Sequence, residues 1–197
     1  MISDEYKTIT DSKIGEGYYT EKRSKFLAFS HHITSTDEAK QILEGYRKKY
    51  YDARHVCYAY MLGPEMDVYR ANDDGEPSGT AGKPILGQIL SNGLTDILIV
   101  VARYYGGVNL GTGGLIVAYR SAAAAAIEDS IIELKQVEEQ VKFTFPYVMM
   151  NSVMRIVKEM SPNIISQKYD NTCEITFSIR KSKAEIFRHK LEKLSFE

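Results

Sequence analysis

The distribution of glycine constrains this chain more than any other feature of its sequence. Ten of its 14 glycines fall between Gly75 and Gly114. Glycine is unfavourable inside helices and strands, and it is common where the backbone turns tightly or closely approaches another group. Within this stretch, Ile97–Ala102 is continuously apolar, which is typical of a strand buried on both faces. We therefore expect two loops dominated by their backbone, joined by a short helix and a strand.

Helical and strand patterns surround these loops. Ser35 and Glu38 have capping-box spacing, which predicts an amphipathic helix over 36–51. Two more helices are predicted, one from Pro84 to Asn92-Gly93 and one over 115–129. The other strands expected in this part of the chain lie at 26–29, 55–62 and 66–71.

The composition changes around 133–139, which predicts a domain boundary between residues 1–135 and residues 136–197. Beyond it, alternating apolar residues predict strands at 141–145, 164–169 and 173–179. One helix is expected after Pro146, and another with Ser182 and Glu185 as its cap. This β-α-β-β-α order predicts a ferredoxin-like α/β sandwich short of its last strand. The chain is thus expected to be an α+β protein of two domains.

The first glycine-rich loop, Asn72–Pro84, combines carboxylates, hydroxyls and a lysine at the start of a helix. Carboxylates are able to hold a hard cation such as Mg²⁺, while backbone N–H groups and Lys83 bind an anion. The alternative is a long turn, in which Asp, Asn, Ser and Gly are the usual residues. We favour ligand binding, because a turn rarely needs so many kinds of polar group. The candidate residues are Asp73, Asp74, Glu76, Ser78, Thr80 and Lys83, the first three also being the candidate Mg²⁺ ligands.

The second loop, Arg103–Gly114, follows the buried strand and precedes a helix. It matches no standard phosphate-binding fingerprint, since Gly111 is followed by Thr112 where a P-loop needs lysine. Helix-terminal N–H groups near Gly113 are still able to bind an anion, or the glycines simply let the helix pack closely on the sheet. Both interpretations stay open here. The candidate ligand-binding residues are Arg103, Tyr104, Asn109 and Thr112, together with Arg54 and His55 at the start of the strand over 55–62.

Two other features of the sequence are weaker candidates for a functional site. His55 and Cys57 point to one face of a strand, which permits a nucleophilic pair, but a buried structural cysteine is the more common outcome. A basic cluster flanked by Tyr50 and Tyr51 is able to meet RNA phosphates and stacked bases, although such charges more often form a solvated helix face. Its members are Lys22, Arg23, Lys25, Arg47, Lys48 and Lys49, with Arg54 also in the cluster.

Charge and composition exclude several classes of protein. The 25 Lys+Arg residues are balanced by 26 Asp+Glu, which argues against non-specific coating of nucleic acid, and no DNA sequence specificity is expected. No run of about 18 apolar residues exists, so no membrane span is expected. Cys57 and Cys173 lie far apart without disulfide or metal spacing, which fits a reducing cytoplasm.

Three segments, Arg54–Tyr60, Asn72–Pro84 and Val101–Leu115, closely resemble the IMPACT family in its bacterial, YigZ-type form. The resemblance covers essentially the whole chain. It implies a left-handed βαβ first domain, like those of translation factors and ribosomal proteins, and a second domain like the last domain of elongation factor G. Eukaryotic members are tied to translational control through protein contacts, but they carry a different N-terminal domain, so that mechanism is not carried over. For the bacterial members, the resemblance implies no catalytic residues.

Three hypotheses about function follow. The leading one is a non-enzymatic regulatory binding protein of the translation apparatus that contacts RNA or a ribosome-associated factor. The second is an enzyme acting on a phosphorylated small molecule or nucleotide with a divalent cation, and the third is a protein-docking module with purely architectural glycines. We expect the two loops to meet in one cleft, where Arg54, Lys83 and Arg103 neutralise an anion. There, the loop carboxylates would bind a cation or fix the loop by accepting backbone hydrogen bonds.

Overall fold

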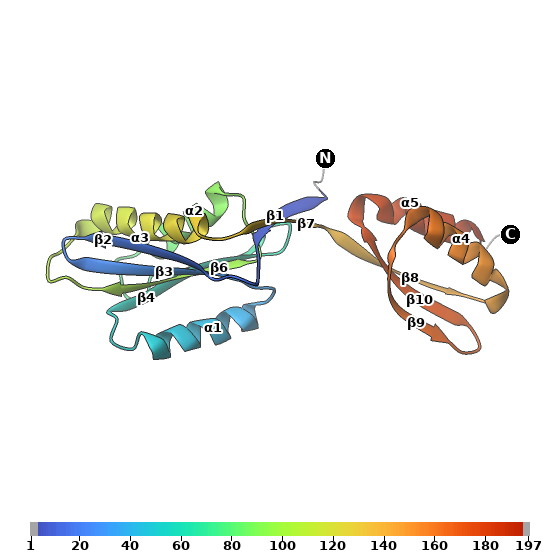
Figure 1. Cartoon of the computed structure of the whole chain (residues 1–197), viewed down its shortest axis with the longest axis horizontal. Helices are drawn as coiled ribbons and strands as arrows, with labels where there is room; N and C mark the ends of the chain where they lie inside the picture. Colours follow the sequence, from blue (N-terminus) through green and yellow to red (C-terminus); the bar gives the residue numbers. More distant parts are fainter. Residues whose placement is uncertain (1–3, 195–197) are drawn as a thin grey trace. The chain divides into compact units, whose positions relative to one another are not determined.

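The computed structural model of the chain describes residues 4–194, so residues 1–3 and 195–197, at the outer ends of the two expected domains, lie outside the described residues (Figure 1). The described chain divides into two compact units. One is Tyr6–Lys135, and the other comprises residues 136–194 together with Asp4 and Glu5. Within residues 4–194, each helix is either too short or too polar to span a lipid bilayer.

The first unit is built on a five-stranded antiparallel sheet with the order β2-β3-β6-β4-β5. The central strand β6 has every residue from Ile97 to Arg103 buried. This confirms the prediction, from its unbroken apolar sequence, of a strand covered on both faces. The strands are β2 (Gly15–Glu21), β3 (Ser24–His32), β4 (His55–Leu62), β5 (Val68–Asn72) and β6 (Ile97–Tyr104).

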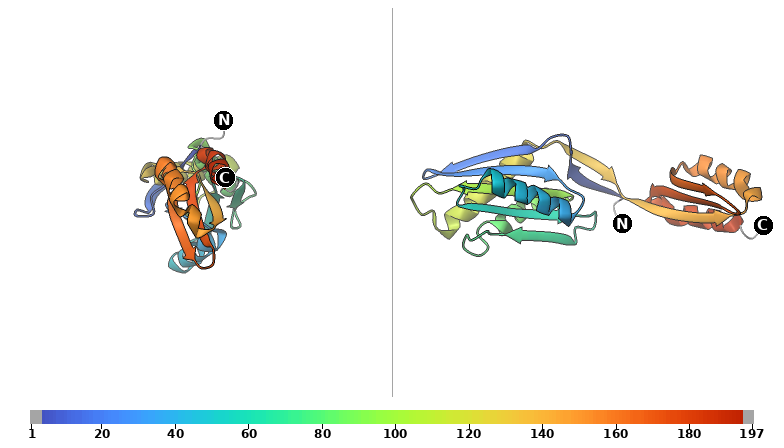
Figure 2. Two further views of the ribbon diagram at one scale, coloured as in Figure 1. Left: turned by 90° about the vertical axis from the view of Figure 1, so that its right-hand side faces the viewer. Right: turned by 90° about the horizontal axis from the view of Figure 1, so that it is seen from below.

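Helices cover both faces of this sheet, with α1 (Thr36–Lys49) on one face and α2 (Gly82–Ser91) and α3 (Gly111–Glu128) on the other (Figure 1). The right-hand view of Figure 2 shows α1 in front of the strands. Helix α1 begins as predicted, because Ser35 Oγ accepts the Glu38 N–H at 3.2 Å. Phe29 and Tyr46 belong to the core beneath α1, whereas Phe26 and Tyr119 belong to the core beneath α2 and α3.

Close packing of α3 on the sheet explains part of the small-residue content. A Cβ on Gly17 of β2 would lie 2.4 Å from the carbonyl oxygen of Ala122, so only glycine fits there. Ala122, Ala123 and Ala126 are fully buried on the facing side of α3. Gly17, which lies outside the two glycine-rich loops, therefore allows α3 to pack closely on the sheet.

The sequence patterns missed three strands. Strand β2 was overlooked because its two glycines and its polar residues hide the alternation. The others, β1 (Glu5–Ile9) and β7 (Ile132–Gln136), form a separate two-stranded sheet. Helix α3 also begins at Gly111, earlier than the predicted residue 115.

The second unit is a three-stranded antiparallel sheet with the order β8-β10-β9, whose buried side chains share one core with two helices. Phe177 of the central strand and Phe187 of the last helix meet edge-to-face at 5.1 Å. The predicted cap of that helix is wrong, because the N-cap residue is Arg180 and makes no side-chain cap. The Ser182 N–H instead donates to Asp4 Oδ1 at 2.9 Å. The elements are β8 (Glu138–Phe145), a 3₁₀ turn (Tyr147–Met149), α4 (Met150–Met160), β9 (Asn163–Tyr169), β10 (Cys173–Arg180) and α5 (Lys181–Lys193).

Candidate functional site

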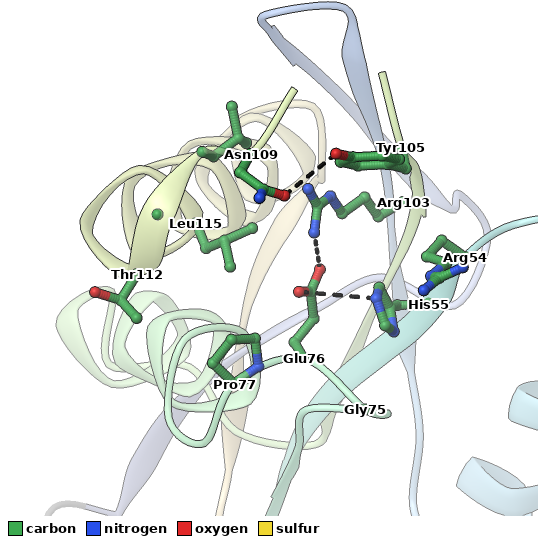
Figure 3. A pocket seen from close by; sticks show the side chains of 12 residues that line it. Arg54, His55, Gly75, Glu76, Pro77, Arg103, Tyr105, Asn109, Thr112 and Leu115 are labelled. Atoms are coloured by element: carbon green, nitrogen blue, oxygen red, sulfur yellow. Dashed lines mark hydrogen bonds and ion pairs between the residues drawn. The ribbon is translucent and has the colours of Figure 1, made fainter. Parts of the chain in front are cut away.

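The two glycine-rich loops line one cavity of about 580 Å³ at the end of the sheet (Figure 3). Strand pairing explains this, because His55 at the start of β4 lies opposite Arg103 near the end of β6. Residues Gly75–Pro77 of the first loop and Tyr105 and Asn109–Thr112 of the second complete most of the wall. A cavity of this size is in the usual range for small-molecule sites.

Glu76 forms the floor of the cavity and is buried. Its Oε1 accepts hydrogen bonds from Arg103 Nη1 at 2.5 Å and from the Tyr119 hydroxyl at 2.8 Å. Its Oε2 lies 3.8 Å from His55 Nε2. A buried carboxylate is tolerated when it is paired and hydrogen-bonded, and Glu76 meets both conditions.

The imidazole of His55 is held in one orientation by the first loop. Its Nδ1 lies 2.7 Å from the carbonyl oxygen of Asp74, and a carbonyl only accepts, so Nδ1 carries the proton. This leaves Nε2 on the Glu76 side of the ring, toward the cavity (Figure 3). The ring is thus presented to a ligand by a backbone contact rather than by a second carboxylate.

Asp73 organises the first loop through three backbone hydrogen bonds. Its Oδ1 accepts the N–H groups of Ala81 at 3.0 Å and Gly82 at 2.8 Å, and its Oδ2 accepts that of Gly79 at 2.8 Å. Burial alone would raise the pKa of this carboxyl, but these N–H groups and the Lys83 charge outweigh it, and the pKa is lowered. Asp73 therefore fixes the loop at the start of α2, the second of the two roles expected for the loop carboxylates.

Asp73→Asn should lower the free energy of unfolding by about 1–3 kcal/mol near pH 7, because one oxygen acceptor becomes an NH₂ group facing backbone donors. A lowered folded-state pKa means that the carboxylate stabilises the fold above its unfolded pKa of about 3.9 and loses this effect as pH falls through the folded value. Urea unfolding of both proteins should therefore show a difference that shrinks below about pH 4.

The control for this experiment is Asp37→Asn, an exposed carboxylate in the first turn of α1. It should change the free energy of unfolding by less than about 1 kcal/mol. A gap between wild type and Asp73→Asn that stays constant down to about pH 3 would contradict the assigned role of the carboxylate.

The three loop carboxylates do not converge on a cation. Asp74 Oδ2 accepts the Val56 N–H at 2.7 Å, and its Oδ1 lies 3.7 Å from Arg47 Nη2. Asp73 and Glu76 have the separate partners described above. Over residues 4–194, no group of three or more His, Cys, Asp or Glu side chains is arranged to hold a metal ion. The residues expected to bind Mg²⁺ therefore do not fit one.

The N-terminus of helix α3 opens onto the cavity. Its N-cap residue Leu110 makes no side-chain cap hydrogen bond, and Gly111 has a φ of 72°. Gly111 and Thr112 line the cavity. The N–H groups of a first helical turn lack partners within the helix, so this end favours an anion.

Comparison with known proteins identifies the family. Residues 22–127 match the family model described as the Impact N-terminal domain. The chain is 32% identical over 176 residues to the IMPACT family member YigZ of Escherichia coli, covering 88% of this chain and 86% of that protein. The chain belongs to the IMPACT family.

A further relative and two solved structures are similar to this chain to different degrees. IMPACT family member YvyE of Bacillus subtilis is 36% identical over 127 residues, 64% of this chain and 58% of that protein. A crystal structure described as a hypothetical protein has a TM-score of 0.75 and 29% identity, covering 98% of this chain and 94% of that one. The two-domain translational regulator Yih1 has a TM-score of 0.40 and 25% identity, covering 59% and 47%.

Six residues expected at the site in this IMPACT family member do not line the cavity, and Asp73 and Asp74, described above, are two of them. Lys83 lines a separate hollow beside Arg120, so only Arg54 and Arg103 of the expected cationic trio remain. Tyr104 follows Arg103 on a strand and so faces the opposite side, where its hydroxyl donates to Asp52; this bond raises the pKa of Tyr104 to about 12. The others are Ser78, which is exposed, and Thr80, whose hydroxyl donates to the Pro77 carbonyl.

Two tyrosines of the site were missed in the sequence. Tyr105 lines the cavity, and the Arg103 guanidinium lies 5.6 Å from its ring centroid. Tyr119 is fully buried, and burial raises the pKa of its hydroxyl. A single tyrosine on the apolar face of an alanine-rich helix was the available signal, because a buried hydroxyl needs a hydrogen-bond partner.

Cys57 takes the structural role that we favoured. It is fully buried, and its thiol lies 3.0 Å from the Asp73 carbonyl oxygen and 3.3 Å from the Tyr119 hydroxyl. Burial raises the pKa of the thiol, which is the opposite of what a nucleophile requires.

Apart from Arg54, the residues of the basic cluster come from the β2–β3 turn, the start of β3 and the last turn of α1, which lie toward the cavity end of the sheet (Figure 1). Lys25 lies opposite Tyr104, and the Gly106 N–H donates to Ser24 Oγ at 3.1 Å in the β2–β3 turn. The contact between Arg47 and Asp74 connects the last turn of α1 to the first loop. We call this region the basic end; it comprises Lys22, Arg23, Lys25, Arg47, Lys48 and Lys49.

Proposed function

We propose that this IMPACT family protein is a regulatory binding protein of the translation apparatus that contacts RNA through the basic end of its five-stranded sheet. Similarity to the IMPACT family supports a role in translation, and the local cluster of basic residues supports RNA as the ligand. We also propose that the first unit has a left-handed βαβ fold and that the second unit has a ferredoxin-like fold. The β8-β10-β9 order supports the latter.

The observation that carries the proposal is the gathering of the basic end beside exposed aromatic rings. The whole chain has a formal charge of −1, so the six basic residues of this end are a local cluster, of which Arg47 lies 3.7 Å from Asp74. Tyr51 is 85% exposed and Tyr105 is 47% exposed, both at the same end of the sheet. Lysine and arginine contact phosphates, while exposed rings stack on unpaired bases.

The double variant Lys25→Gln/Lys48→Gln should weaken binding of a labelled single-stranded RNA and flatten its salt dependence. Each lost phosphate contact should reduce the slope of log K against log salt by about 0.7, so two should reduce it by about 1.4. Fluorescence anisotropy between about 50 and 200 mM salt measures both quantities.

The matched control is Lys83→Gln/Arg120→Gln, which removes the same charge from the separate hollow beside α2. It should leave the slope unchanged. Absence of wild-type binding at the lowest salt concentration, where phosphate contacts are strongest, would overturn the RNA proposal.

An enzyme that transfers phosphate with a divalent cation has less support from the geometry. Such chemistry relies on metal ions to position and neutralise the phosphate. The loop carboxylates that would hold the metal are turned toward the backbone and toward Arg103.

A further inference from the structure

We propose that the cavity between the two glycine-rich loops is a socket for a terminal phosphate group, a phosphomonoester. Arg54, Arg103 and the N-terminus of α3 would hold the phosphate oxygens. The inference extends the proposed function, because the 5′ end of an RNA is one source of such a group. A small phosphorylated molecule is the other source, and the socket itself does not depend on which one supplies the phosphate.

Arg103 provides the main reason to expect an oxyanion. It is only 5% exposed, and its Nη1 is used by Glu76, yet its Nε has no hydrogen-bond partner within the described chain. A buried charged donor without a partner is costly, so it calls for an acceptor. The Nε edge of a guanidinium is one of the faces that binds an oxyanion through two hydrogen bonds. Figure 3 shows Arg103 between Glu76 and the Tyr105–Asn109 side of the cavity.

The start of α3 provides a second, independent set of donors. The helix has 18 residues, and its N-cap Leu110 makes no side-chain cap hydrogen bond. Gly111 and Thr112 line the cavity, and no described atom lies within 4 Å of where a Cβ on Gly111 would stand. The backbone is therefore open to close approach, which phosphate binding at a helix N-terminus requires.

The charges around the cavity favour a terminal phosphate over an internal diester. The negative charge of Glu76 is balanced by the positive charge of Arg103. Arg54 at the exposed rim and the N-terminus of α3 therefore leave the cavity with an excess of positive charge, next to His55. A phosphomonoester carries nearly two negative charges and three acceptor oxygens near neutral pH. An internal diester has one charge and two such oxygens. Several converging donors therefore match the monoester better.

The cavity is also large enough for more than the phosphate. Its volume of about 580 Å³ lies in the range that holds small ligands. The half-exposed ring of Tyr105 stands at its edge and offers a surface on which a base can stack. Asn109 Oδ1 accepts from the Tyr105 hydroxyl at 3.2 Å, so the amide nitrogen of Asn109 is a further donor.

The test compares two labelled RNAs of identical sequence, one with a 5′-phosphate and one with a 5′-hydroxyl. Wild-type protein should bind the phosphorylated RNA about tenfold more tightly, the effect of one charge-assisted hydrogen bond. AMP should compete with it, and adenosine should not. Arg54→Gln, an exposed and therefore structurally mild change, should abolish the preference, whereas Lys83→Gln should retain it.

The outcomes separate the socket from the proposed function. Equal, salt-sensitive binding of both RNAs, with no effect of AMP, would overturn the socket and leave RNA binding in place. Calorimetric binding of AMP that Arg54→Gln abolishes, without affinity for either RNA, would support the socket with a small-molecule source and overturn the RNA proposal. Failure of RNA, AMP and inorganic phosphate to bind would overturn both.

Discussion

Glu76→Ala should lower the free energy of unfolding by about 3–5 kcal/mol, as expected when one partner of a buried ion pair is removed. The carboxylate accepts from Arg103 and Tyr119, and all three side chains are buried. Without it, the guanidinium stays buried with no opposite charge, and the Tyr119 hydroxyl loses its acceptor. Urea unfolding followed by circular dichroism measures the change.

Two variants control for this result. Glu76→Gln keeps an oxygen acceptor and nearly the same volume, so its loss should be clearly smaller than that of Glu76→Ala. Glu44→Ala removes an exposed carboxylate from α1 and should stay within about 0.5 kcal/mol of wild type. A fall of less than about 1 kcal/mol for Glu76→Ala would show that Arg103 does not depend on this carboxylate.

Gly106→Ala is the second substitution expected to have a large effect. A Cβ at this position would lie 2.2 Å from the carbonyl carbon of Arg23 and 2.3 Å from the Ser24 nitrogen. Both are backbone atoms, so the β2–β3 turn would have to move away from the end of β6. We expect destabilisation by about 1–3 kcal/mol or more. RNA binding should also weaken, because Lys22 and Arg23 are part of that turn.

Gly113→Ala is the matched control from the same loop region. Nothing lies within 4 Å of its Cβ position, and the residue is helical, so alanine should stabilise the protein by up to about 1 kcal/mol. In urea unfolding, Gly106→Ala should lower the free energy of unfolding and Gly113→Ala should raise it. This difference would show that the effect at Gly106 comes from close packing and not from a general intolerance of the loop to substitution. Equal effects would contradict the assigned contact.

Several elements with strong local signals were predicted correctly, although the cap expected at Ser182 and Glu185 was not. Ser35 and Glu38 lie within one helical turn, so their capping interaction is formed by neighbours in the sequence. The apolar run of β6 predicted burial on both faces because no polar residue interrupts it. The meeting of the two glycine-rich loops was also expected, although it depends on the pairing of β4 with β6.

The wrongly predicted site residues are those whose positions depend on the direction of a side chain or on contacts between segments distant in the sequence. Lys83 and Tyr104 were chosen as site residues because of their neighbours in the sequence, but the start of α2 and the alternation of β6 turn them elsewhere. Asp73 could not be separated from Asp74 by residue type. Their roles differ because different backbone N–H groups approach each carboxylate.

Local sequence patterns were sufficient to predict an α+β protein and its buried central strand. These features follow from short-range regularities, in which each residue acts with partners a few positions away. The joining of Glu76, Arg103 and Tyr119 into one buried group became visible only in the folded chain, as did the Arg103 Nε donor that has no partner among residues 4–194. The physical reason is that a hydrogen bond between residues 27 or 43 positions apart depends on the exact packing of strands and helices, which no local pattern encodes.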